Sequence, residues 1–356
     1  MVHSKLLYKL SNYGVSGNLL SWIDAFLSNR LQCVVTEHCF SDWSTVLSGV
    51  PQGSVLGPIL FILYVDDIGS ICSANVSHKL FADDLKLYST INSDLDRMSL
   101  QAALTRLQQW CNDWQLTINI TKCHVLHIGR NTHKSSYQYS LGGHPICEAD
   151  VITDLGVIVD PILKYEAHIN KLVGKGYSRV GLLYKGFASR SPRVLKQAYI
   201  TYIRPVLEYA SSVWSPHLIK HIDAIERVQK KFTKRIRTIS DLSYPERLAA
   251  LDLEPLELRR LKTDLILYYK CMNGLVALPY ADYFNVSNVI SQTRTGGNRL
   301  IQASCSTNQF QNDFFNRSVS CWNFLPPHII ATDTVFKFKR LLSTVDLRRF
   351  LKCTYF

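Results

Sequence analysis

Two short apolar segments flank an Asp-Asp pair near residue 84, and this feature constrains the fold of the chain more than any other. Residues 80–82 read Leu-Phe-Ala, Asp83 and Asp84 follow, and residues 85–88 read Leu-Lys-Leu-Tyr. Short apolar runs on either side of a polar turn predict a tight β-hairpin. Such a hairpin would hold both carboxylates rigidly, and carboxylate oxygens on a rigid support are what a divalent metal site requires.

A second Asp-Asp pair lies seventeen residues earlier, at Asp66 and Asp67. It follows the apolar run at residues 59–65, so we expect it at the C-terminal end of a helix, where acidic groups oppose the helix dipole. Adjacent carboxylates by themselves commonly mark a solvated turn. The flanking residues therefore favour Asp83 and Asp84, and not the earlier pair, as metal ligands.

Hydrophobic periodicity predicts an α+β fold. Apolar residues at three- and four-residue spacing indicate helices over residues 3–12, 17–29 and 93–114. Residues 31–48 alternate as strands do, and residues 49–54 form a turn before an apolar helix that ends near Gly69, with Ser54 as its N-cap. We expect further strands at residues 116–128 and 152–159, and an almost wholly helical stretch over residues 168–273.

The basic charge of the chain is concentrated in one segment. The net charge is +12, and residues 164–240 hold 16 Lys and Arg against 4 Asp and Glu, so the rest of the chain is balanced. This distribution fits a nucleic-acid-binding surface, although a solvated basic helix face is the alternative. In residues 222–236 an apolar stripe is predicted at Ile222, Ile225, Val228, Phe232 and Ile236. Five basic residues fall largely outside that stripe and are the predicted nucleic-acid contacts: Arg227, Lys230, Lys231, Lys234 and Arg235.

Several other classes of protein are disfavoured. The ten cysteines include no Cys-x-x-Cys pair, so a structural zinc site is not expected, and residues 123–127 fit strand packing better than metal binding because a fourth ligand is lacking nearby. Neither a signal peptide nor an apolar run long enough for a membrane span is apparent. We expect an intracellular protein, nuclear or cytoplasmic, without a membrane partner.

Two motifs in fixed order resemble a known family. Residues 49–58 read Gly-Val-Pro-Gln-Gly-Ser-Val-Leu-Gly-Pro, and after a helix residues 80–85 read Leu-Phe-Ala-Asp-Asp-Leu. They resemble adjoining polymerase motifs of the reverse transcriptases of non-long-terminal-repeat (LINE-type) retrotransposons, particularly the jockey-like group. The resemblance covers essentially the whole chain. Its further parts are Trp110, Trp114, Leu116, Asn119 and Lys122, with Cys123 where the family usually has Thr; residues 154–157 with His168, similar to the primer grip; and residues 225–236, 322–326 and 336–338.

The resemblance implies an RNA-directed DNA polymerase that works by two-metal nucleotidyl transfer. Its implied metal is Mg²⁺, two ions in an intact site, with Mn²⁺ as a substitute. Its implied partners are an RNA template, a DNA primer and deoxynucleoside triphosphates. The implied roles are metal binding and catalysis for Asp83 and Asp84, proximity to the pyrophosphate leaving group for Lys122, and contact with the templating base and nucleotide for Gln52, Gly53 and Ser54.

The resemblance also implies a division of the chain. We expect a truncated palm, a small antiparallel sheet backed by helices, over residues 1–130, and primer-grip-like connecting strands over 131–165. A basic thumb-like helical region over 166–280 and a C-terminal appendage over 281–356 follow.

In the family a further catalytic carboxylate comes from a strand that precedes the first helices. Here no Asp or Glu precedes Asp24, so we expect this polypeptide alone to be inactive. Two alternatives are a non-catalytic nucleic-acid-binding remnant that uses the basic helical region and a helical structural protein with relic motifs.

Overall fold

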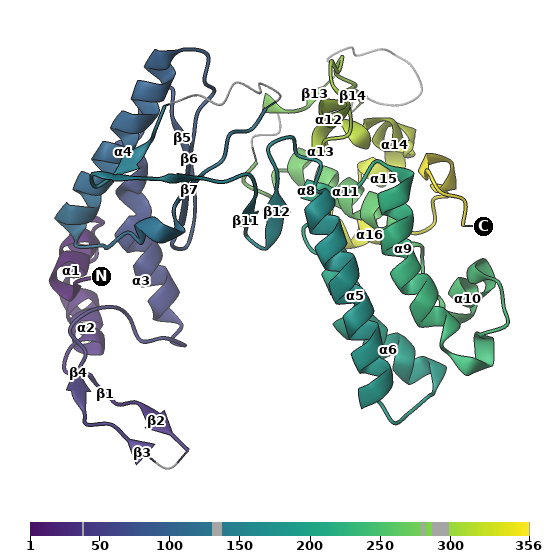
Figure 1. Cartoon of the computed structure of the whole chain (residues 1–356), viewed down its shortest axis with the longest axis horizontal. Coiled ribbons are helices and arrows are strands. Elements are labelled where there is room, and N and C mark those ends of the chain that lie inside the picture. The colour runs from purple at the N-terminus through teal and green to yellow at the C-terminus, as the bar shows by residue number, and fades with distance from the viewer. Residues whose placement is uncertain (38, 130–136, 279–281, 287–298, 356) are drawn as a thin grey trace. The chain divides into compact units, whose positions relative to one another are not determined.

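The structure is a computed structural model that describes residues 1–37, 39–129, 137–278, 282–286 and 299–355. The chain forms two compact units (Figure 1). Unit 1 comprises Met1–Val125 and Asn131–Ala149, and unit 2 comprises Leu126–Arg130 and Asp150–Phe356. The expected boundaries at residues 130/131 and 280/281 lie outside the described residues, and the four-part division stays a prediction.

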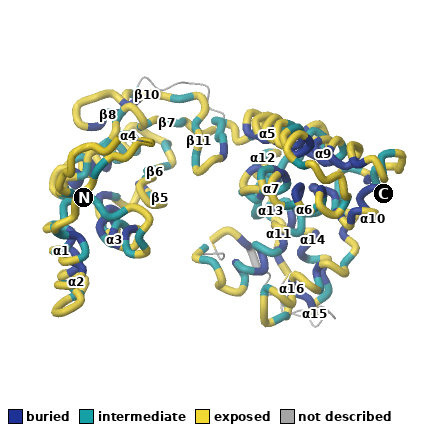
Figure 2. The backbone as a smooth tube through the Cα atoms, turned by 90° about the horizontal axis from the view of Figure 1, so that it is seen from below, coloured by how far each residue is buried: buried dark blue, intermediate teal, exposed yellow. Residues whose placement is uncertain are grey.

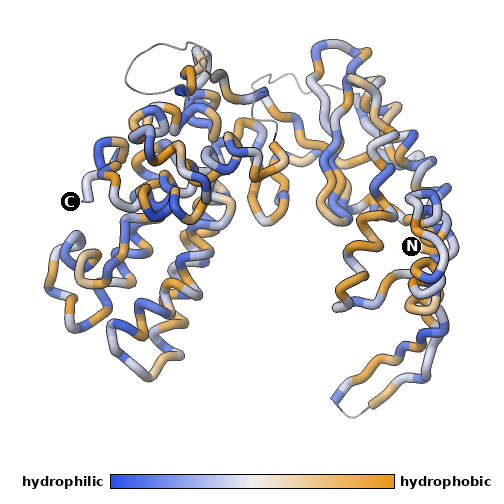
Figure 3. Tube along the Cα trace, turned by 180° about the vertical axis from the view of Figure 1, so that it is seen from behind, coloured by the Kyte–Doolittle hydropathy of each residue, from blue (hydrophilic) through white to orange (hydrophobic). Residues whose placement is uncertain are grey.

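The helices of unit 1 follow the predicted stripes. They are α1 (His3–Asn12), α2 (Gly17–Leu27), α3 (Leu56–Val65), the 3₁₀ helix η1 (Asp66–Ile71) and α4 (Asp94–Trp114). Leu6 and Leu10 of α1, Tyr64 of α3 and Leu107 of α4 share one buried core. Figure 3 shows α3 as apolar along most of its length. Ser93 starts α4 with a capping box, in which its side chain and that of Asp96 each bind the other residue's backbone N–H.

The described strands of unit 1 pair in twos. β1 (Leu31–Gln32) pairs with β4 (Ser44–Thr45), and β2 (Val35–Thr36) pairs with β3 (Cys39–Phe40), so the predicted β-region is one antiparallel ribbon. β5 (Ser77–Phe81) and β6 (Asp84–Tyr88) form a hairpin. The expected small sheet thus takes the form of separate two-stranded ladders in the residues described. The remaining pairs are β7 (His124–Val125) with β10 (Cys147–Glu148), which is parallel, and β8 (Ser140–Leu141) with β9 (His144–Pro145).

The strand predicted at residues 116–128 is largely wrong. Only β7 is a strand there, and a 3₁₀ turn, η2 (Ile120–Lys122), comes before it. The carboxamide oxygen of Asn119 accepts hydrogen bonds from the Thr121 backbone N–H at 3.1 Å and from its hydroxyl at 2.6 Å. A side chain that binds backbone two residues ahead stabilises a turn in competition with a strand, which apolar spacing alone does not reveal.

Unit 2 begins with a hairpin of β11 (Ile152–Asp154) and β12 (Val157–Val159) and continues as helices, as predicted. One buried core runs from Val157 to Leu256, and α9 contributes a long buried stretch to it (Figure 2). The helices around this core are α5 (Glu166–Gly186), α6 (Pro192–Tyr202), α7 (Arg204–Glu208), α8 (Ser211–Trp214), α9 (Ile219–Lys234), η3 (Arg237–Ile239), α10 (Tyr244–Leu251) and α11 (Leu256–Met272).

A separate buried core joins the far part of α11 to the C-terminal residues. Tyr268 and Tyr269 of α11 pack with Trp322 and Phe338. The elements around this core are β13 (Asn285–Val286), β14 (Leu300–Ile301), α12 (Asn308–Gln311), α13 (Phe314–Arg317), α14 (Val319–Phe324), α15 (Pro327–Ile330), α16 (Val335–Leu342) and η5 (Arg348–Phe350). No described helix is long and apolar enough to cross a membrane.

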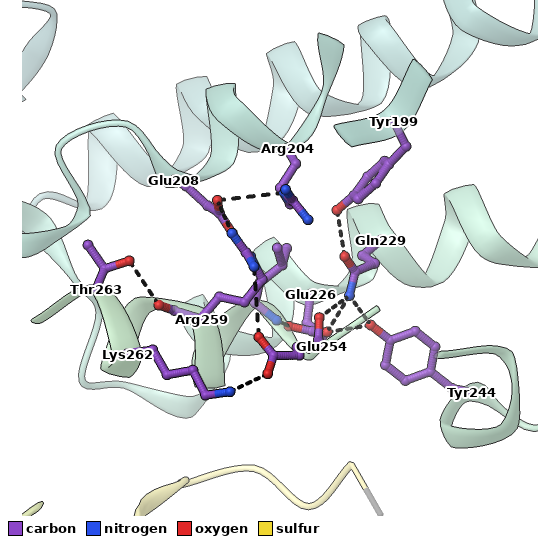
Figure 4. Close-up of polar contacts among 11 residues, drawn as sticks. Tyr199, Arg204, Glu208, Glu226, Gln229, Tyr244, Glu254, Arg259, Lys262 and Thr263 are labelled. Atoms are coloured by element: carbon purple, nitrogen blue, oxygen red, sulfur yellow. Dashed lines mark hydrogen bonds and ion pairs between the residues drawn. The ribbon is translucent and has the colours of Figure 1, made fainter. Parts of the chain in front are cut away.

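A buried polar network fixes α9 against its neighbours in unit 2 (Figure 4). Gln229 accepts a hydrogen bond from the Tyr199 hydroxyl at 2.7 Å and donates to the Tyr244 hydroxyl at 3.0 Å. Tyr244 in turn donates to the fully buried Glu226, whose pKa is raised by burial. The network satisfies polar groups that would otherwise be costly to bury, and it uses acidic side chains internally.

Candidate active site

The predicted carboxylate hairpin is present. β5 and β6 pair from Ser77↔Tyr88 to Phe81↔Asp84, which leaves Ala82 and Asp83 as a two-residue loop. Ala82 has φ +52°, in the left-handed region that a tight turn requires. Asp83 therefore lies in the turn itself, and Asp84 is the first residue of β6.

The hairpin is anchored along one face. Leu80, Leu85 and Leu87 pack against the core of unit 1, whereas Phe81 and Asp84 point to the exposed face. On the anchored side His78 lies so close to Gly69 of η1 that a Cβ on this glycine would come within 2.6 Å of the imidazole ring. Any side chain at position 69 would therefore force the His78 ring to move, so glycine allows close packing where the hairpin meets η1.

Asp83 and Asp84 are exposed, and their side chains make no hydrogen bond or ion pair with any residue that the structure describes. Hard carboxylate oxygens are the donors that Mg²⁺ prefers. Within the described part of the chain, however, no three His, Cys, Asp or Glu side chains come close enough together to hold a metal ion. Asp83 and Asp84 therefore offer suitable oxygen donors, but they do not form a group of three metal-binding side chains with any other described residue.

Asp66 and Asp67 occupy the predicted helix end, at the start of η1 after α3. Asp67 binds the ammonium of Lys9, a residue of α1 whose side chain is only 4 % exposed. Burial lowers the pKa of Lys9, and the hydrogen bond and charge of Asp67 partly offset that shift. Asp66 is exposed and accepts from the Tyr13 hydroxyl at 3.3 Å. Asp67 is therefore a counterion within the fold.

Three aromatic rings complete the surroundings of Lys9. Its Nζ lies 3.7 Å from the ring centroid of Trp114, 4.8 Å from that of Trp110 and 5.2 Å from that of Tyr64. It also donates to the Tyr64 carbonyl at 2.5 Å, and the Trp110 indole N–H donates to Asp67 at 3.2 Å. Trp110 and Trp114 of α4 and Tyr64 of α3 thus surround the buried ammonium of Lys9 from α1.

The turn at residues 49–54 has the geometry that its sequence predicts. Gly53 has φ +82°, and no atom lies within 4 Å of the Cβ position, so backbone conformation and not crowding favours glycine there. The Ser54 hydroxyl donates to the Pro51 carbonyl at 2.7 Å and accepts from the Gly57 N–H at 3.0 Å. The N-cap position of α3 is Val55, one residue after the predicted Ser54, although the Ser54 side chain still binds a backbone N–H of the first turn. Gln52 is exposed.

Lys122 ends the 3₁₀ turn that follows α4, and it is exposed. Gln52, Gly53, Ser54, Lys122 and the two hairpin aspartates all belong to unit 1, but no hydrogen bond or ion pair among the described residues joins the three groups. Each group is held by a different element: the turn before α3, the 3₁₀ turn η2 and the β5–β6 hairpin. Their shared role stays a prediction.

The apolar stripe predicted in residues 222–236 is confirmed, because all five of its residues are at most 1 % exposed. The basic residues outside it have different surroundings. Arg227 and Lys230 share the carboxylate of Asp223, at 2.5 Å and 3.2 Å. The three others make no ion pair with a described residue: Lys231 lies 4.9 Å from the Tyr177 ring centroid, Lys234 donates to the Ser240 carbonyl at 2.7 Å, and Arg235 lies 4.3 Å from the Tyr184 ring centroid.

The primer-grip-like residues lie in unit 2. The turn between β11 and β12 contains Leu155 and Gly156, both at positive φ. The Ile158 N–H donates to Nδ1 of the buried His168 at 3.2 Å, and the Tyr209 hydroxyl donates to the Leu155 carbonyl at 2.9 Å. Burial lowers the pKa of His168. These contacts tie the hairpin to α5 and to the segment after α7.

Sequence reasoning missed two sets of residues. Lys9 falls on the apolar stripe of its helix, three residues after Leu6, and a lysine in that position was a readable signal of a buried cation. Arg190 and Arg237 line one pocket together with Arg235. Arg237 follows Arg235 by two residues and lies just beyond the stretch in which basic residues were predicted as contacts, whereas Arg190 comes from the segment before α6 and no local pattern in the sequence marked it.

Residues 1–159 match the family described as "Reverse transcriptase (RNA-dependent DNA polymerase)". The chain is 27 % identical over 244 residues to the RNA-directed DNA polymerase from the mobile element jockey of Drosophila funebris, and 28 % identical over 244 residues to its Drosophila melanogaster counterpart. Both alignments cover 66 % of this chain and 26 % of the relative. The probable polymerase from the X-element of Drosophila melanogaster is 26 % identical over 223 residues, 60 % of this chain and 24 % of that protein. The chain thus spans about a quarter of the length of the curated relatives it matches.

Proposed function

We propose that this chain is part of an RNA-directed DNA polymerase of the jockey-like, non-long-terminal-repeat retrotransposon type, a nucleotidyltransferase, and that it carries the metal-binding hairpin and the basic helical region. The match of residues 1–159 to the reverse transcriptase family and the similarity to the jockey polymerases support this proposal. The observation that carries the proposal is the pair Asp83 and Asp84, in the turn and at the start of β6 of an anchored hairpin, both exposed and without a hydrogen-bond or ion-pair partner among the described residues. In this proposal residues 1–130 are a truncated palm, residues 131–165 are primer-grip-like connecting strands and residues 166–280 are a thumb-like region.

Each predicted residue keeps a specific role in the proposal. Asp83 and Asp84 would hold Mg²⁺, or Mn²⁺ in its place, in a completed site, where the metal supplies charge neutralisation during nucleotidyl transfer. Gln52, Gly53 and Ser54 would lie against the templating base and the incoming deoxynucleotide. The exposed backbone at Gly53 permits close approach, which supports that role. Lys122 would neutralise the pyrophosphate leaving group or donate a proton to it.

A two-metal site needs more ligands than this hairpin provides. We propose that residues 1–356 alone do not polymerise, because such a site needs a further carboxylate beside the two that the hairpin carries. No chemical step is assigned to the chain by itself.

The alternative function is nucleic-acid binding without chemistry, and the surface of α9 favours it. Lys231, Lys234 and Arg235 are exposed and unpaired with carboxylates in the residues described, which leaves them available to phosphates. Phosphate contacts release counterions, so the affinity for RNA template and DNA primer should fall as salt rises. On duplex DNA each phosphate contact lowers the logarithm of the association constant by about 0.9 for every tenfold rise in salt concentration.

Primer extension separates the two functions. Residues 1–356 and a longer chain that adds the amino-terminal catalytic region of a jockey-type reverse transcriptase would be supplied with primed RNA template, Mg²⁺ and deoxynucleotides. We expect extension from the longer chain only. Both chains should bind the primed template. Replacing Lys231 and Lys234 by Gln should make the slope of log affinity against log salt less steep by the contribution of about two phosphate contacts. Lys339→Gln, an exposed lysine of α16, is the matched control for loss of charge.

Extension by residues 1–356 alone would show that another carboxylate completes the site, with Asp66 the first to examine. Salt-independent binding, or no binding at low salt, would remove the basic face from the proposal. No extension by the longer chain, with binding retained, would favour the non-catalytic alternative.

A further inference from the structure

Three helix ends of unit 2 surround a pocket of about 190 Å³. The C-terminal ends of α5 and α9 and the N-terminal end of α6 meet there. The lining residues are Tyr184, Arg190, Leu195, Arg235, Ile236 and Arg237. Leu195 and Ile236 are buried, whereas the three arginines are exposed at its rim. Half of the lining is therefore cationic.

The three arginines differ in how firmly they are held. Arg190 donates to the Phe187 carbonyl and, at 2.9 Å, to the Tyr184 carbonyl. Arg235 lies over the Tyr184 ring, with 4.3 Å between its guanidinium carbon and the ring centroid. The side chain of Arg237 makes no hydrogen bond, ion pair or ring contact with a residue that the structure describes. Two guanidinium groups are thus positioned in advance, and the third is available to a ligand.

Among the described residues, none of these three arginines forms an ion pair with a carboxylate. Within 4.0 Å of their guanidinium groups there is no acidic oxygen from any described residue. The acidic side chains of residues 164–240 are engaged elsewhere: Glu166 with Lys220, Glu208 with Arg259, Asp223 with Arg227 and Lys230, and Glu226 with Tyr244. Figure 4 shows Glu208 beside Arg259 and Glu226 beside Tyr244.

Neutralisation of helix dipoles is the simpler explanation for cations at helix C-termini, and it accounts for only part of the charge. A helix end carries about half a unit charge, so two C-terminal ends and one N-terminal end contribute about −0.5, against +3 from the guanidinium groups. The surplus is about +2.5 on the same reckoning. A phosphate ester carries about −1 to −2 near neutral pH, which is the class of ligand that matches this surplus.

We propose that Arg190, Arg235 and Arg237 bind a phosphate group carried by a nucleic-acid strand. The inference deepens the proposed binding function and rests on it, since it names the chemical group that is bound and the place where it binds. Guanidinium groups present paired N–H donors that match two oxygens of one phosphate, and lysine does not. The unattached Arg237 would close onto a phosphate already held by the other two.

Fluorescence anisotropy with the full 356-residue chain tests this proposal. The probe is a short single-stranded DNA with a 3′-fluorescein and either a 5′-phosphate or a 5′-hydroxyl. Arg237→Gln should weaken binding by about tenfold, as expected for the loss of a charge-assisted hydrogen bond, and Arg237→Lys should restore only part of the loss. Arg193→Gln, an exposed arginine of α6 outside the lining, should weaken it by less than about threefold.

The two probes identify the source of the phosphate. A loss confined to the 5′-phosphorylated strand assigns the pocket to a strand end, and an equal loss on both strands assigns it to an internal phosphodiester; either result supports the proposal. A loss for Arg237→Gln no larger than that for Arg193→Gln overturns it, even when the wild-type chain binds DNA well. Because the Arg237 side chain makes no hydrogen bond or ion pair with a described residue, its replacement should leave the unfolding temperature unchanged.

A second measurement separates this proposal from the proposed function. Inorganic phosphate, compared with chloride at equal ionic strength, should raise the unfolding temperature of the wild-type chain more than that of Arg237→Gln. One outcome is that phosphate stabilises the wild-type chain more than Arg237→Gln while the wild-type chain fails to bind DNA at low salt. That combination would overturn the proposed nucleic-acid-binding function and show that the pocket binds free phosphate. No difference between the two chains in phosphate overturns the pocket itself.

Discussion

The same dipeptide, Asp-Asp, occurs twice in unit 1 with opposite outcomes. Asp83 and Asp84 lie on a short turn, exposed and without a partner among the described residues, while Asp67 of the earlier pair binds a lysine that is almost wholly buried. A carboxylate that already neutralises a cation within the fold is poorly available to a metal, whereas one held without a counterion is available. The comparison shows that the surroundings of a carboxylate, and not its neighbour in sequence, decide its use.

The largest expected effect concerns activity. In the longer, completed polymerase, Asp83→Asn should lower primer extension by about three orders of magnitude, the rate equivalent of about 4 kcal/mol of lost charge stabilisation. Asp66→Asn changes the same functional group in the other pair and should leave extension within about threefold of wild type, as a surface change does. Single-turnover extension rates provide the measurement. Equal losses in the two variants would remove the distinction between the pairs.

The next expected effect is on the free energy of unfolding, which should fall more when Asp67 is replaced than when its partner Lys9 is replaced. Asp67→Ala leaves the buried Lys9 ammonium without its counterion and should lower the free energy of unfolding by about 2 kcal/mol, below the 3–5 kcal/mol of fully buried pairs because Asp67 is 40 % exposed. Lys9→Met leaves a carboxylate that water can solvate and should cost about 1 kcal/mol or less. Urea unfolding followed by tryptophan fluorescence measures both. A larger loss for Lys9→Met would contradict this account.

The stability difference between wild type and Asp67→Ala should also depend on pH, because Asp67 affects the pKa of Lys9. The pKa of Lys9 in the folded protein lies below its ordinary value of 10.5, so between these two values the unfolded chain binds more protons and stability rises with pH. Loss of Asp67 lowers the folded pKa further, because its charge and hydrogen bond had raised it. The stability gap between wild type and Asp67→Ala should therefore narrow as pH rises toward 10.5. In a Lys9→Met background the gap should not change with pH.

The smallest effect is expected at the hairpin. Asp83→Ala removes an exposed charge that has no partner among the described residues, so the free energy of unfolding should change by no more than about 0.5 kcal/mol. Thermal unfolding of residues 1–356 measures the change, with Asp67→Ala as the destabilised reference. A cost comparable to that of the reference would mean that Asp83 holds the fold together, and its proposed role in metal binding would lose its basis.

The features that sequence predicted are those with local causes. The hairpin at residue 83 and the buried stripe of α4 each depend on residues a few positions apart, and each is present. The predicted N-cap of α3 was placed one residue early, at Ser54 and not at Val55. The ion pair between Lys9 and Asp67 joins residues 58 positions apart, and the arginine pocket draws on three segments, so no periodicity encodes them. Where a strand was predicted at residues 116–128, the Asn119 side chain accepts two hydrogen bonds from Thr121 and stabilises a turn.

The length of the hairpin loop has a consequence for how this stretch of chain can vary. Only Ala82 and Asp83 separate the paired residues Phe81 and Asp84. Successive side chains of a strand point to opposite faces, so inserting or deleting one residue in β6 just after Asp84 would exchange its inward and outward positions. Leu85 and Leu87 would then leave the core that they now share with Leu80. Copies of this sequence that still fold should therefore differ here by substitution and not by length.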